Sequence, residues 1–210
     1  MKNLFPLLLL LFFFSVQCQT TVQKTRETKR LSIPEGQSVA YFASGCFWCV
    51  EGVYESVYGV TEVYSGYAGG QKANPSYYDH GNHAETVAVF YDPKKVTYAQ
   101  LLDVFFDITN PYTLGQAPDF GVSYRSVLFP KDDNEWAAIQ QSLTALEGHK
   151  IEVQKGDNPP FTLAEDYHQN YVQRLLNGEK VVNKSYGLNV SLPRRKDFFE
   201  KTKVRLKEAN

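Results

Sequence analysis

The order of the predicted secondary-structure elements indicates an α+β fold in which one β-sheet packs against helices as a two-layer sandwich. Between residues 38 and 129, short β-rich runs and segments with helical periodicity alternate in the order β-α-β-β-α-β. That order is the split β-α-β arrangement of ferredoxin-like folds. The composition agrees, because 210 residues with 43% hydrophobic and 21% charged side chains suffice for one domain with a full core. Additional helices and a C-terminal extension follow the sixth element.

The first β-α-β unit carries a Cys-x-x-Cys motif at its first turn. Residues 38–44 are predicted as a strand that Gly45 ends. Residues 46–58 have apolar side chains at helical spacing and are followed by Gly59, which predicts a helix. Residues 60–67 alternate between apolar and polar side chains and predict the second strand, after which a glycine pair begins a loop.

The second unit has the same kinds of signal. Residues 85–91 are a β-rich run stopped by an Asp-Pro pair. Thr97 is a candidate N-cap for a helix over residues 98–108, and residues 124–129 predict a strand ended by proline. Further elements are expected at residues 134–147 (helix), 151–154 (strand), 163–176 (helix) and 195–206 (helix). The last helix is basic with acidic residues interspersed, which indicates a solvated face.

The first 18 residues have the features of a signal peptide with a lipobox-like end. Lys2 precedes an apolar run over residues 4–16, which is too short for a comfortable membrane span. At the end of this run, Ser15-Val16-Gln17-Cys18 resembles the lipobox of bacterial lipoproteins. We therefore expect an exported bacterial protein, periplasmic or anchored to the membrane through lipid on Cys18; a plain cleaved signal and an uncleaved anchor are the alternatives. The polar residues 19–36 are predicted to be a flexible tether.

Net charge and cysteine count exclude several functions. The formal charge of −1 leaves no basic footprint for nucleic acid. Cys18, Cys46 and Cys49 are the only cysteines, so no disulfide framework can hold the fold together. A zinc site is not expected either, because the four histidines show no convincing ligand spacing beside the Cys-x-x-Cys pair.

Cys46 stands where the first predicted strand meets the first predicted helix. Backbone N–H groups at a helix N-terminus lack helical partners and favour negative charge. We therefore expect a lowered pKa and a thiolate at Cys46. Cys49 lies three residues further on and shares a helical face with Cys46, so the two sulfurs can meet. Two small buried hydrophobic residues are the alternative interpretation, but the pattern favours redox or nucleophilic use.

Several ordered motifs resemble those of the peptide methionine sulfoxide reductase A family. The family signature, Gly-Cys-Phe-Trp followed closely by Glu, is similar to residues 45–51. Later matches follow in order at Gly66-Tyr-Ala-Gly-Gly70, Asn74-Pro-Ser-Tyr77, His83-Ala-Glu85, Tyr91-Asp-Pro93, Asp119 with Tyr124-Arg-Ser126, and residues 164–171. The resemblance spans residues 39–171 and implies a catalytic domain over residues 37–180, with residues 181–210 as a C-terminal extension.

The resemblance implies thiol-dependent reduction of methionine S-sulfoxide in proteins and peptides. Attack of Cys46 on the sulfoxide sulfur moves charge onto the oxygen, which must then be protonated. Glu85 is the implied acid, as a buried carboxyl with a raised pKa. Tyr77 and Tyr124 are the implied hydrogen-bond donors to the sulfoxide oxygen. Asp119 is implied to organise polar groups and water in the site.

Phe47 and Trp48 are the implied apolar wall that receives the substrate methyl group. His83 and His168 lie in matching segments and are interpreted as structural hydrogen-bonding residues. Taken singly, each of these side chains has a plainer interpretation as core packing or surface. The ordered match is what favours function.

Recycling of the enzyme is expected to use Cys49. Reduction of the substrate should leave Cys46 as a sulfenic acid. Many family members resolve it with cysteines in a glycine-rich C-terminal tail, but here no cysteine follows Cys49 and the tail is rich in Lys and Arg. Cys49 is then the natural resolving thiol, and an external thioredoxin or other dithiol would reopen the disulfide. Direct attack of the reductant on the sulfenic acid is the alternative. We expect no prosthetic cofactor and no metal, and a monomer.

Two segments depart from the family pattern. Asn110-Pro111 stands where the family usually has His-Asp-Pro, and residues 116–121 stand where it has Gln-Gly-Asn-Asp. Substrate preference and the detailed role of Asp119 therefore stay open. The main competing function is an exported Cys-x-x-Cys dithiol–disulfide oxidoreductase. A lipid-anchored module that binds oxidised methionine without chemistry is a third possibility.

Overall fold

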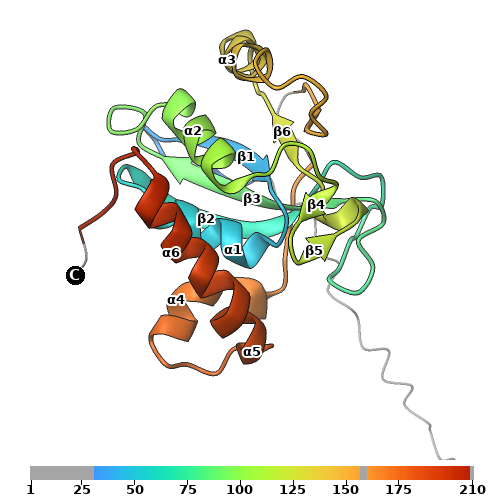
Figure 1. Ribbon diagram of the computed structural model, residues 1–210, viewed down its shortest axis with the longest axis vertical. Helices are drawn as coiled ribbons and strands as arrows, with labels where there is room; N and C mark the ends of the chain where they lie inside the picture. Colours follow the sequence, from blue (N-terminus) through green and yellow to red (C-terminus); the bar gives the residue numbers. More distant parts are fainter. Residues whose placement is uncertain (1–30, 157–159, 209–210) are drawn as a thin grey trace, which may run out of the picture.

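The computed structural model describes residues 31–156 and 160–208 (Figure 1). The predicted signal peptide (residues 1–18) and most of the predicted tether (residues 19–36) lie outside the described residues. Within the described part, no helix is both long and apolar enough to cross a bilayer. Leu31, the first described residue, packs against an apolar cluster on one face of the sheet.

The centre of the fold is a six-stranded sheet with the strand order β7-β6-β1-β3-β2-β8. All neighbouring strands are antiparallel except β6 and β7, which are parallel. The strands are β1 (Ser38–Ala43), β2 (Val60–Ala68), β3 (Ala84–Tyr91), β6 (Val127–Phe129), β7 (Glu152–Val153) and β8 (Thr162–Leu163). The central order β6-β1-β3-β2, with a helix after β1 and another after β3, confirms the predicted ferredoxin-like α+β fold.

Alternate residues of each strand pack against opposite faces of the sheet. Ala40 and Phe42 of β1 belong to the main core, whereas Val39 and Tyr41 belong to a smaller cluster on the other face. The helices that pack into the main core are α1 (Phe47–Tyr54), α2 (Tyr98–Ile108), α4 (Tyr171–Leu176) and α6 (Leu192–Lys201). In Figure 1, α6 passes in front of the sheet and α4 lies below α1. Helix α3 (Asp133–Leu143) lies beyond the β6 side of the sheet.

Thr97 begins α2 as predicted, through a reciprocal capping box. The Gln100 N–H donates to Thr97 Oγ1 at 3.3 Å, and the Thr97 N–H donates to Gln100 Oε1 at 3.0 Å. Two backbone donors that lack helical partners are satisfied in this way, and α2 ends at Ile108 as predicted. Helices α1 and α3 are shorter than predicted, since they end at Tyr54 and Leu143.

The predicted strand 124–129 is correct only in its second half. Strand β6 begins at Val127, and Tyr124 closes a single 3₁₀ turn, η1 (Val122–Tyr124). The Arg125 guanidinium stabilises this turn, because it donates to the Val122 carbonyl at 2.9 Å. Two short strands that the sequence did not indicate form a hairpin just before it, β4 (Gly115–Gln116) and β5 (Asp119–Phe120).

The predicted helix 163–176 is wrong over its first half. The chain there forms β8, a 3₁₀ turn η2 (Asp166–His168) and only then α4. The Gln169 side chain accepts the Ser65 N–H at 3.0 Å and donates to the Ser65 carbonyl at 3.0 Å. Asn170 has a φ of +53°. Side-chain bonds to a distant strand thus replace the helical bonds of this segment.

The C-terminal helix differs from the prediction in its bounds and its surroundings. Instead of residues 195–206, the continuous helical segment comprises α5 (Lys184–Tyr186), a π-helical turn η3 (Gly187–Ser191) and α6, and it ends at Lys201. The Arg194 guanidinium donates to the Ile108 carbonyl at 2.7 Å, and that of Arg195 donates to the Gly52 carbonyl at 3.1 Å. The expectation of a fully solvated basic face is therefore wrong at these two arginines, because backbone carbonyls of the core elements bind them.

Candidate active site

Cys46 lies at the turn between β1 and α1, as predicted. It is the N-cap residue of α1, and it is 5% exposed. Gly45 before it has a φ of +75°, and a Cβ at this position would lie 2.7 Å from the Cβ of Gln116. Glycine adopts this left-handed backbone without strain, and it leaves room for Gln116 because it has no Cβ. The turn therefore holds the thiol in one place, beside the first N–H groups of α1.

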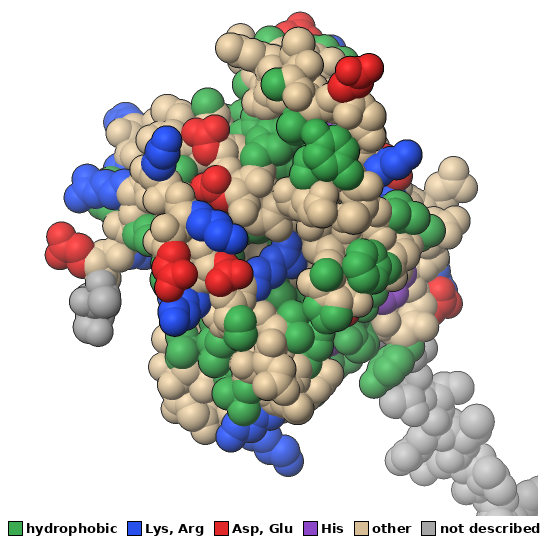
Figure 2. All heavy atoms as spheres, in the orientation of Figure 1, with side chains coloured by type: hydrophobic (Ala, Val, Ile, Leu, Met, Phe, Trp, Pro, Cys, Tyr) green, Lys and Arg blue, Asp and Glu red, His purple; other side chains and the backbone are tan. Residues whose placement is uncertain are grey.

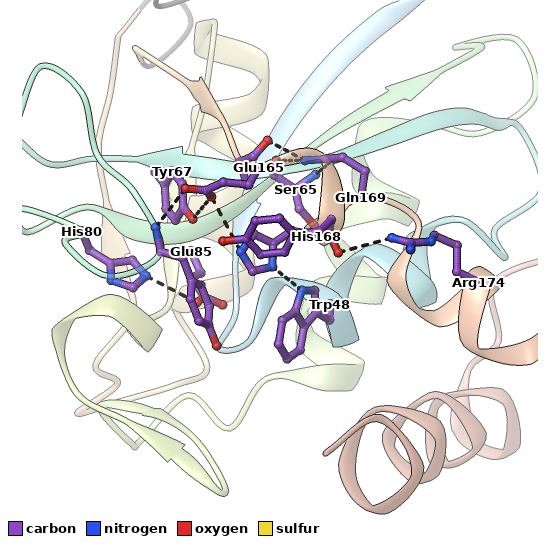
Figure 3. A network of polar contacts seen from close by, with 12 residues as sticks. Trp48, Ser65, Tyr67, His80, Glu85, Glu165, His168, Gln169 and Arg174 are labelled. Carbon is purple, nitrogen blue, oxygen red and sulfur yellow. Dashed lines mark hydrogen bonds and ion pairs between the residues drawn. The ribbon is translucent and has the colours of Figure 1, made fainter. Parts of the chain in front are cut away.

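Glu85 reaches the same turn from the central strand β3. Its Oε2 accepts the Phe47 N–H at 2.9 Å, and its Oε1 lies 3.4 Å from His80 Nε2 (Figure 3). Burial raises the pKa of Glu85, although the His80 ring and the Phe47 N–H oppose part of that rise. The carboxyl therefore keeps its proton to a higher pH than a surface glutamate does, next to the peptide that follows Cys46.

Cys46 and Cys49 form one coupled dithiol. Burial raises the pKa of Cys46 well above that of an ordinary thiol, and the neighbouring Cys49 raises it further. The pKa of Cys49 is lowered to about 6, first because Cys46 donates a hydrogen bond to it, and also because Arg194 is near. The expected lowering of the Cys46 pKa is therefore wrong. Loss of water around its sulfur outweighs the helix N-terminus, and the two thiols ionise as one coupled pair.

Tyr77, Tyr124 and Asp119 lie around the Cys46 and Glu85 pair. Burial raises the pKa of both tyrosines, and Glu85, Cys46 and Asp119, when they are ionised, raise it further. The same three acidic groups act on both hydroxyls, so the five side chains surround one site. Both tyrosines are therefore protonated hydrogen-bond donors at neutral pH. The structure brings together the polar site residues that the resemblance implied.

Phe47 and Trp48 form an aromatic cluster next to Tyr77. Ring centroids are 6.4 Å apart for Phe47 and Tyr77, and 5.9 Å apart for Trp48 and Tyr77. The Trp48 indole N–H donates to His168 Nδ1 at 3.0 Å, and the indole stacks on Tyr171 with centroids 4.2 Å apart. These contacts fix both rings as a rigid apolar wall beside the polar groups. His168 has the structural hydrogen-bonding role predicted for it.

A buried polar network positions these aromatic side chains, and the sequence did not reveal it (Figure 3). Glu165 accepts the Tyr67 hydroxyl at 2.9 Å and the Tyr77 N–H at 3.4 Å. Its Oε2 also lies 3.7 Å from His168 Nε2, and His168 in turn holds Trp48. Glu165 lies inside the matched segment 164–171, so its position was visible in the sequence. Its contacts with Tyr67 and Tyr77 were not visible, because these residues belong to a strand and a loop much earlier in the chain.

The two histidines near β3 have different surroundings. The Gly70 N–H donates to His83 Nδ1 at 3.2 Å, and His83 Nε2 bonds the Lys72 carbonyl at 2.9 Å, in agreement with the structural role predicted. His80 instead faces Glu85, and sequence reasoning missed it. The available signal was a histidine shortly after the tyrosine motif, in a chain that has only four histidines.

Three further side chains reach the site from the C-terminal extension. Ser191 and Tyr186 lie beside the Cys49 sulfur, and Arg194 acts on it electrostatically. The Tyr186 hydroxyl also bonds the Asp119 carboxylate. No sequence signal pointed to these residues, because the extension lies beyond the matched motifs. Across residues 31–156 and 160–208, no group of three or more His, Cys, Asp or Glu side chains is arranged to hold a metal ion.

Comparison with known proteins agrees with this geometry. A family model described as peptide methionine sulfoxide reductase matches residues 38–200. The peptide methionine sulfoxide reductase MsrA of Acinetobacter baumannii strain AYE is 41% identical over 142 residues, which are 64% of this chain and 82% of the relative. The protein of the same name from Polynucleobacter asymbioticus is 43% identical over 145 residues, which are 64% of this chain and 76% of the relative.

Solved structures give the same result. Methionine sulfoxide reductase A of Corynebacterium diphtheriae superposes with a TM-score of 0.59 at 28% identity, over 67% of this chain and 76% of its own. Mxr1 from Saccharomyces cerevisiae in its reduced form superposes with a TM-score of 0.59 at 30% identity, over 73% of this chain and 93% of its own. The chain therefore belongs to the peptide methionine sulfoxide reductase family and is an oxidoreductase that acts on methionine sulfoxide.

Proposed function

We propose that the enzyme reduces the S epimer of methionine sulfoxide in proteins and peptides through a sulfenic acid on Cys46. The observation that carries this proposal is the Glu85 carboxyl, which is buried, has a raised pKa and hydrogen-bonds the N–H of Phe47. A proton donor thus lies beside the thiol that must attack. Neither a binding module nor a purely structural cysteine pair requires that arrangement.

In the reductive step, the Cys46 sulfur attacks the sulfoxide sulfur while Glu85 protonates the oxygen. The attack forms a sulfur–sulfur bond between Cys46 and the substrate. The protonated oxygen then passes to the Cys46 sulfur as the sulfur–oxygen bond of the substrate and the new sulfur–sulfur bond break, and methionine leaves. The proton that the Cys46 thiol gives up restores Glu85, so the net change is transfer of one oxygen atom. Cys46 is oxidised to sulfenic acid, and the substrate sulfur is reduced.

The surrounding side chains bind and orient the substrate in this proposal. The hydroxyls of Tyr77 and Tyr124 donate hydrogen bonds to the sulfoxide oxygen as its charge grows. Phe47 and Trp48 receive the substrate methyl group against their rings. Asp119 holds the polar side of the site in place through its bond to Tyr186.

Recycling then proceeds through Cys49. Its thiolate attacks the Cys46 sulfenic acid, a disulfide forms, and a thioredoxin-like dithiol reopens it from outside. The lowered pKa of Cys49 and its hydrogen-bonded contact with Cys46 support this role, since a resolving thiol must be ionised and adjacent. No bound cofactor is needed, because the external dithiol supplies both electrons.

The decisive experiment is a stoichiometric reaction with peptides that contain each sulfoxide epimer, followed by mass mapping. One equivalent of the S epimer should give one methionine per chain and a Cys46–Cys49 disulfide, whereas the R epimer should not react. Equal reduction of both epimers, or methionine release without a Cys46–Cys49 bond, would contradict the proposal. Mixed disulfides with partner proteins and no sulfoxide turnover would instead favour a general dithiol–disulfide oxidoreductase.

We also propose that the enzyme is exported in a bacterium and anchored through lipid on Cys18, and that it acts as a monomer. The Lys2 start, the apolar run and the lipobox-like end support the location. Intact mass of the mature N-terminus, compared between the wild type and Cys18→Ser, tests the anchor. Sedimentation equilibrium of the soluble variant tests the monomer.

A further inference from the structure

The C-terminal helical segment lies directly against the dithiol turn. In Figure 1, α6 crosses the sheet in front of α1. From this segment, Ser191 Oγ lies 3.3 Å from Cys49 Sγ, and the Tyr186 hydroxyl lies 3.9 Å from the same sulfur. Ser191 is fully buried. A sulfur that is otherwise packed in the apolar core thus has two hydroxyl groups within reach.

Arg194 brings a positive charge to the same turn. Its Nη2 donates to the Ile108 carbonyl at 2.7 Å and to the Ser44 carbonyl at 3.1 Å. Its Nη1 is so close to Gly45 that a Cβ there would lie 3.4 Å away. The guanidinium is therefore tied to the backbone that leads into Cys46, and its position does not depend on solvent.

Arg194 also borders an open surface groove between α6 and the loop of residues 110–120. Figure 2 shows this hollow, with Lys or Arg side chains inside it. The cation is thus partly hydrated while its hydrogen bonds keep it beside the dithiol. Partial hydration weakens its effect on the sulfur but does not remove it.

These contacts act on the sulfur of Cys49, which is the resolving thiol of the proposed cycle. The Cys46 thiol, Ser191 and Tyr186 hydrogen-bond Cys49, and the charge of Arg194 acts on it electrostatically. The last three groups come from the extension. Cys46 donates the strongest stabilising hydrogen bond to the thiolate, and burial opposes it. Once Cys46 becomes a sulfenic acid, that thiol donor no longer exists. The extension then has to stabilise the Cys49 thiolate without it.

We propose that Ser191 and Arg194 are positioning residues for the resolving step, which hold Cys49 as a thiolate aimed at Cys46 after oxidation. This inference rests on the proposed recycling through Cys49. In the step, the Cys49 sulfur forms a bond to the Cys46 sulfur and the Cys46 sulfur–oxygen bond breaks. The leaving hydroxide takes a proton from solvent, to which Cys49 released its own proton on ionising, and it departs as water. Cys49 is oxidised and the Cys46 sulfur is reduced, and no further reactant is required.

The test measures the ionisation of Cys49 by thiolate absorbance at 240 nm. The full chain carries Cys18→Ser and Cys46→Ser, so that Cys49 is the only thiol and a hydroxyl donor is kept at position 46. Arg194→Gln should raise the ionisation midpoint by about one pH unit, and Ser191→Ala should raise it by less, since a nearby cation shifts a pKa more than one neutral hydrogen bond does. Arg194→Lys should restore part of the shift.

Arg195→Gln is the matched control. It removes the same charge from the same helix, but Arg195 binds Gly52 and Ser56 rather than the dithiol turn. Its midpoint should stay at the parent value. Equal shifts in Arg194→Gln and Arg195→Gln would show a general loss of helix packing and overturn the inference. The inference would also be overturned if the ionisation midpoint stayed at the parent value in both Arg194→Gln and Ser191→Ala. Ser191→Ala is nearly isosteric, so it should leave the packing intact.

A kinetic readout separates this inference from the proposed function. With Cys46 present, the rate of disulfide closure after one equivalent of sulfoxide should fall about threefold in Arg194→Gln at pH 5. A tenfold loss of thiolate is partly offset there by the greater nucleophilicity of a more basic sulfur. If the parent enzyme forms no disulfide, the proposed recycling fails. If the parent forms it and Arg194→Gln closes it as fast, only the present inference fails.

Discussion

Replacement of Glu85 by glutamine isolates the proton that the proposed reductive step requires. Glutamine has the same size and keeps an oxygen that can accept the Phe47 N–H, which Glu85 now accepts at 2.9 Å. The site geometry should therefore persist, and the lost feature is the transferable proton. General acid catalysis contributes about 10²- to 10⁴-fold, so the first-turnover rate should fall by that factor. Such a fall corresponds to an activation barrier about 3–5 kcal/mol higher.

The same substitution, Glu85→Gln, should not lower the stability of the protein at pH 7. The folded-state pKa of Glu85 is raised, mainly by burial, so the folded protein binds this proton more tightly than the unfolded chain does. That contribution to stability is present below the ordinary carboxyl pKa and is lost as the pH rises through the raised value. Glu85→Gln carries no such pH-dependent loss, so at pH 7 the variant should be at least as stable as the wild type. Urea unfolding at pH 5 and pH 7 measures this difference.

The assay is rapid-quench measurement of methionine release in a single turnover with an S-sulfoxide peptide. Glu51→Gln is the control, because Glu51 is also a buried carboxyl, with a pKa raised to about 8 mainly by burial, but it accepts the Tyr171 N–H instead. Its first-turnover rate should stay near that of the wild type. A Glu85→Gln rate within tenfold of the wild type, with unchanged substrate binding, would remove Glu85 from the acid role.

Three other perturbations test separate parts of the structure. Cys49→Ser should release one methionine per chain but lose most multiple turnover with thioredoxin, and full recycling would refute the resolving role. Gly45→Ala should lower the free energy of unfolding by about 1–3 kcal/mol from backbone strain, plus a clash with Gln116. Gly148→Ala, with a φ of +76° and open space around it, should show the backbone cost alone; equal losses in urea would exclude the clash. His80→Asn should raise the pKa of Glu85, because His80 now lowers it. The fall of the first-turnover rate at alkaline pH should therefore move to higher pH, and an unmoved profile would contradict the contact between His80 and Glu85.

Burial changes how the attacking thiol is understood. It raises the pKa of Cys46, so this sulfur is less ionised than a solvent-exposed thiol at the same helix end would be. A buried sulfur with little thiolate character is less open to oxidants other than the substrate. The nearby Glu85 carboxyl favours a substrate whose oxygen accepts a proton.

Local sequence signals determined the central fold. The β-rich run in residues 38–44, the alternation in residues 60–67 and the helical spacing after Thr97 each depend on neighbours within a few positions, so period and capping could be seen without the structure. The turn at Gly45 was visible for the same reason. The motif spacing also placed the site residues Cys46 and Glu85 in one matched set before any distance between them was known.

Tertiary structure decided everything that depends on contacts between distant segments. The prediction of a helix over residues 163–176 was wrong in its first half because the Gln169 side chain bonds Ser65. Ser65 lies about a hundred positions earlier in the chain, so no local pattern contains that partner. The expected lowering of the Cys46 pKa failed because the loss of solvent around its sulfur exists only once distant segments have packed around it. Periodicity is a property of neighbours, whereas desolvation and charge depend on what the folded chain places around an atom.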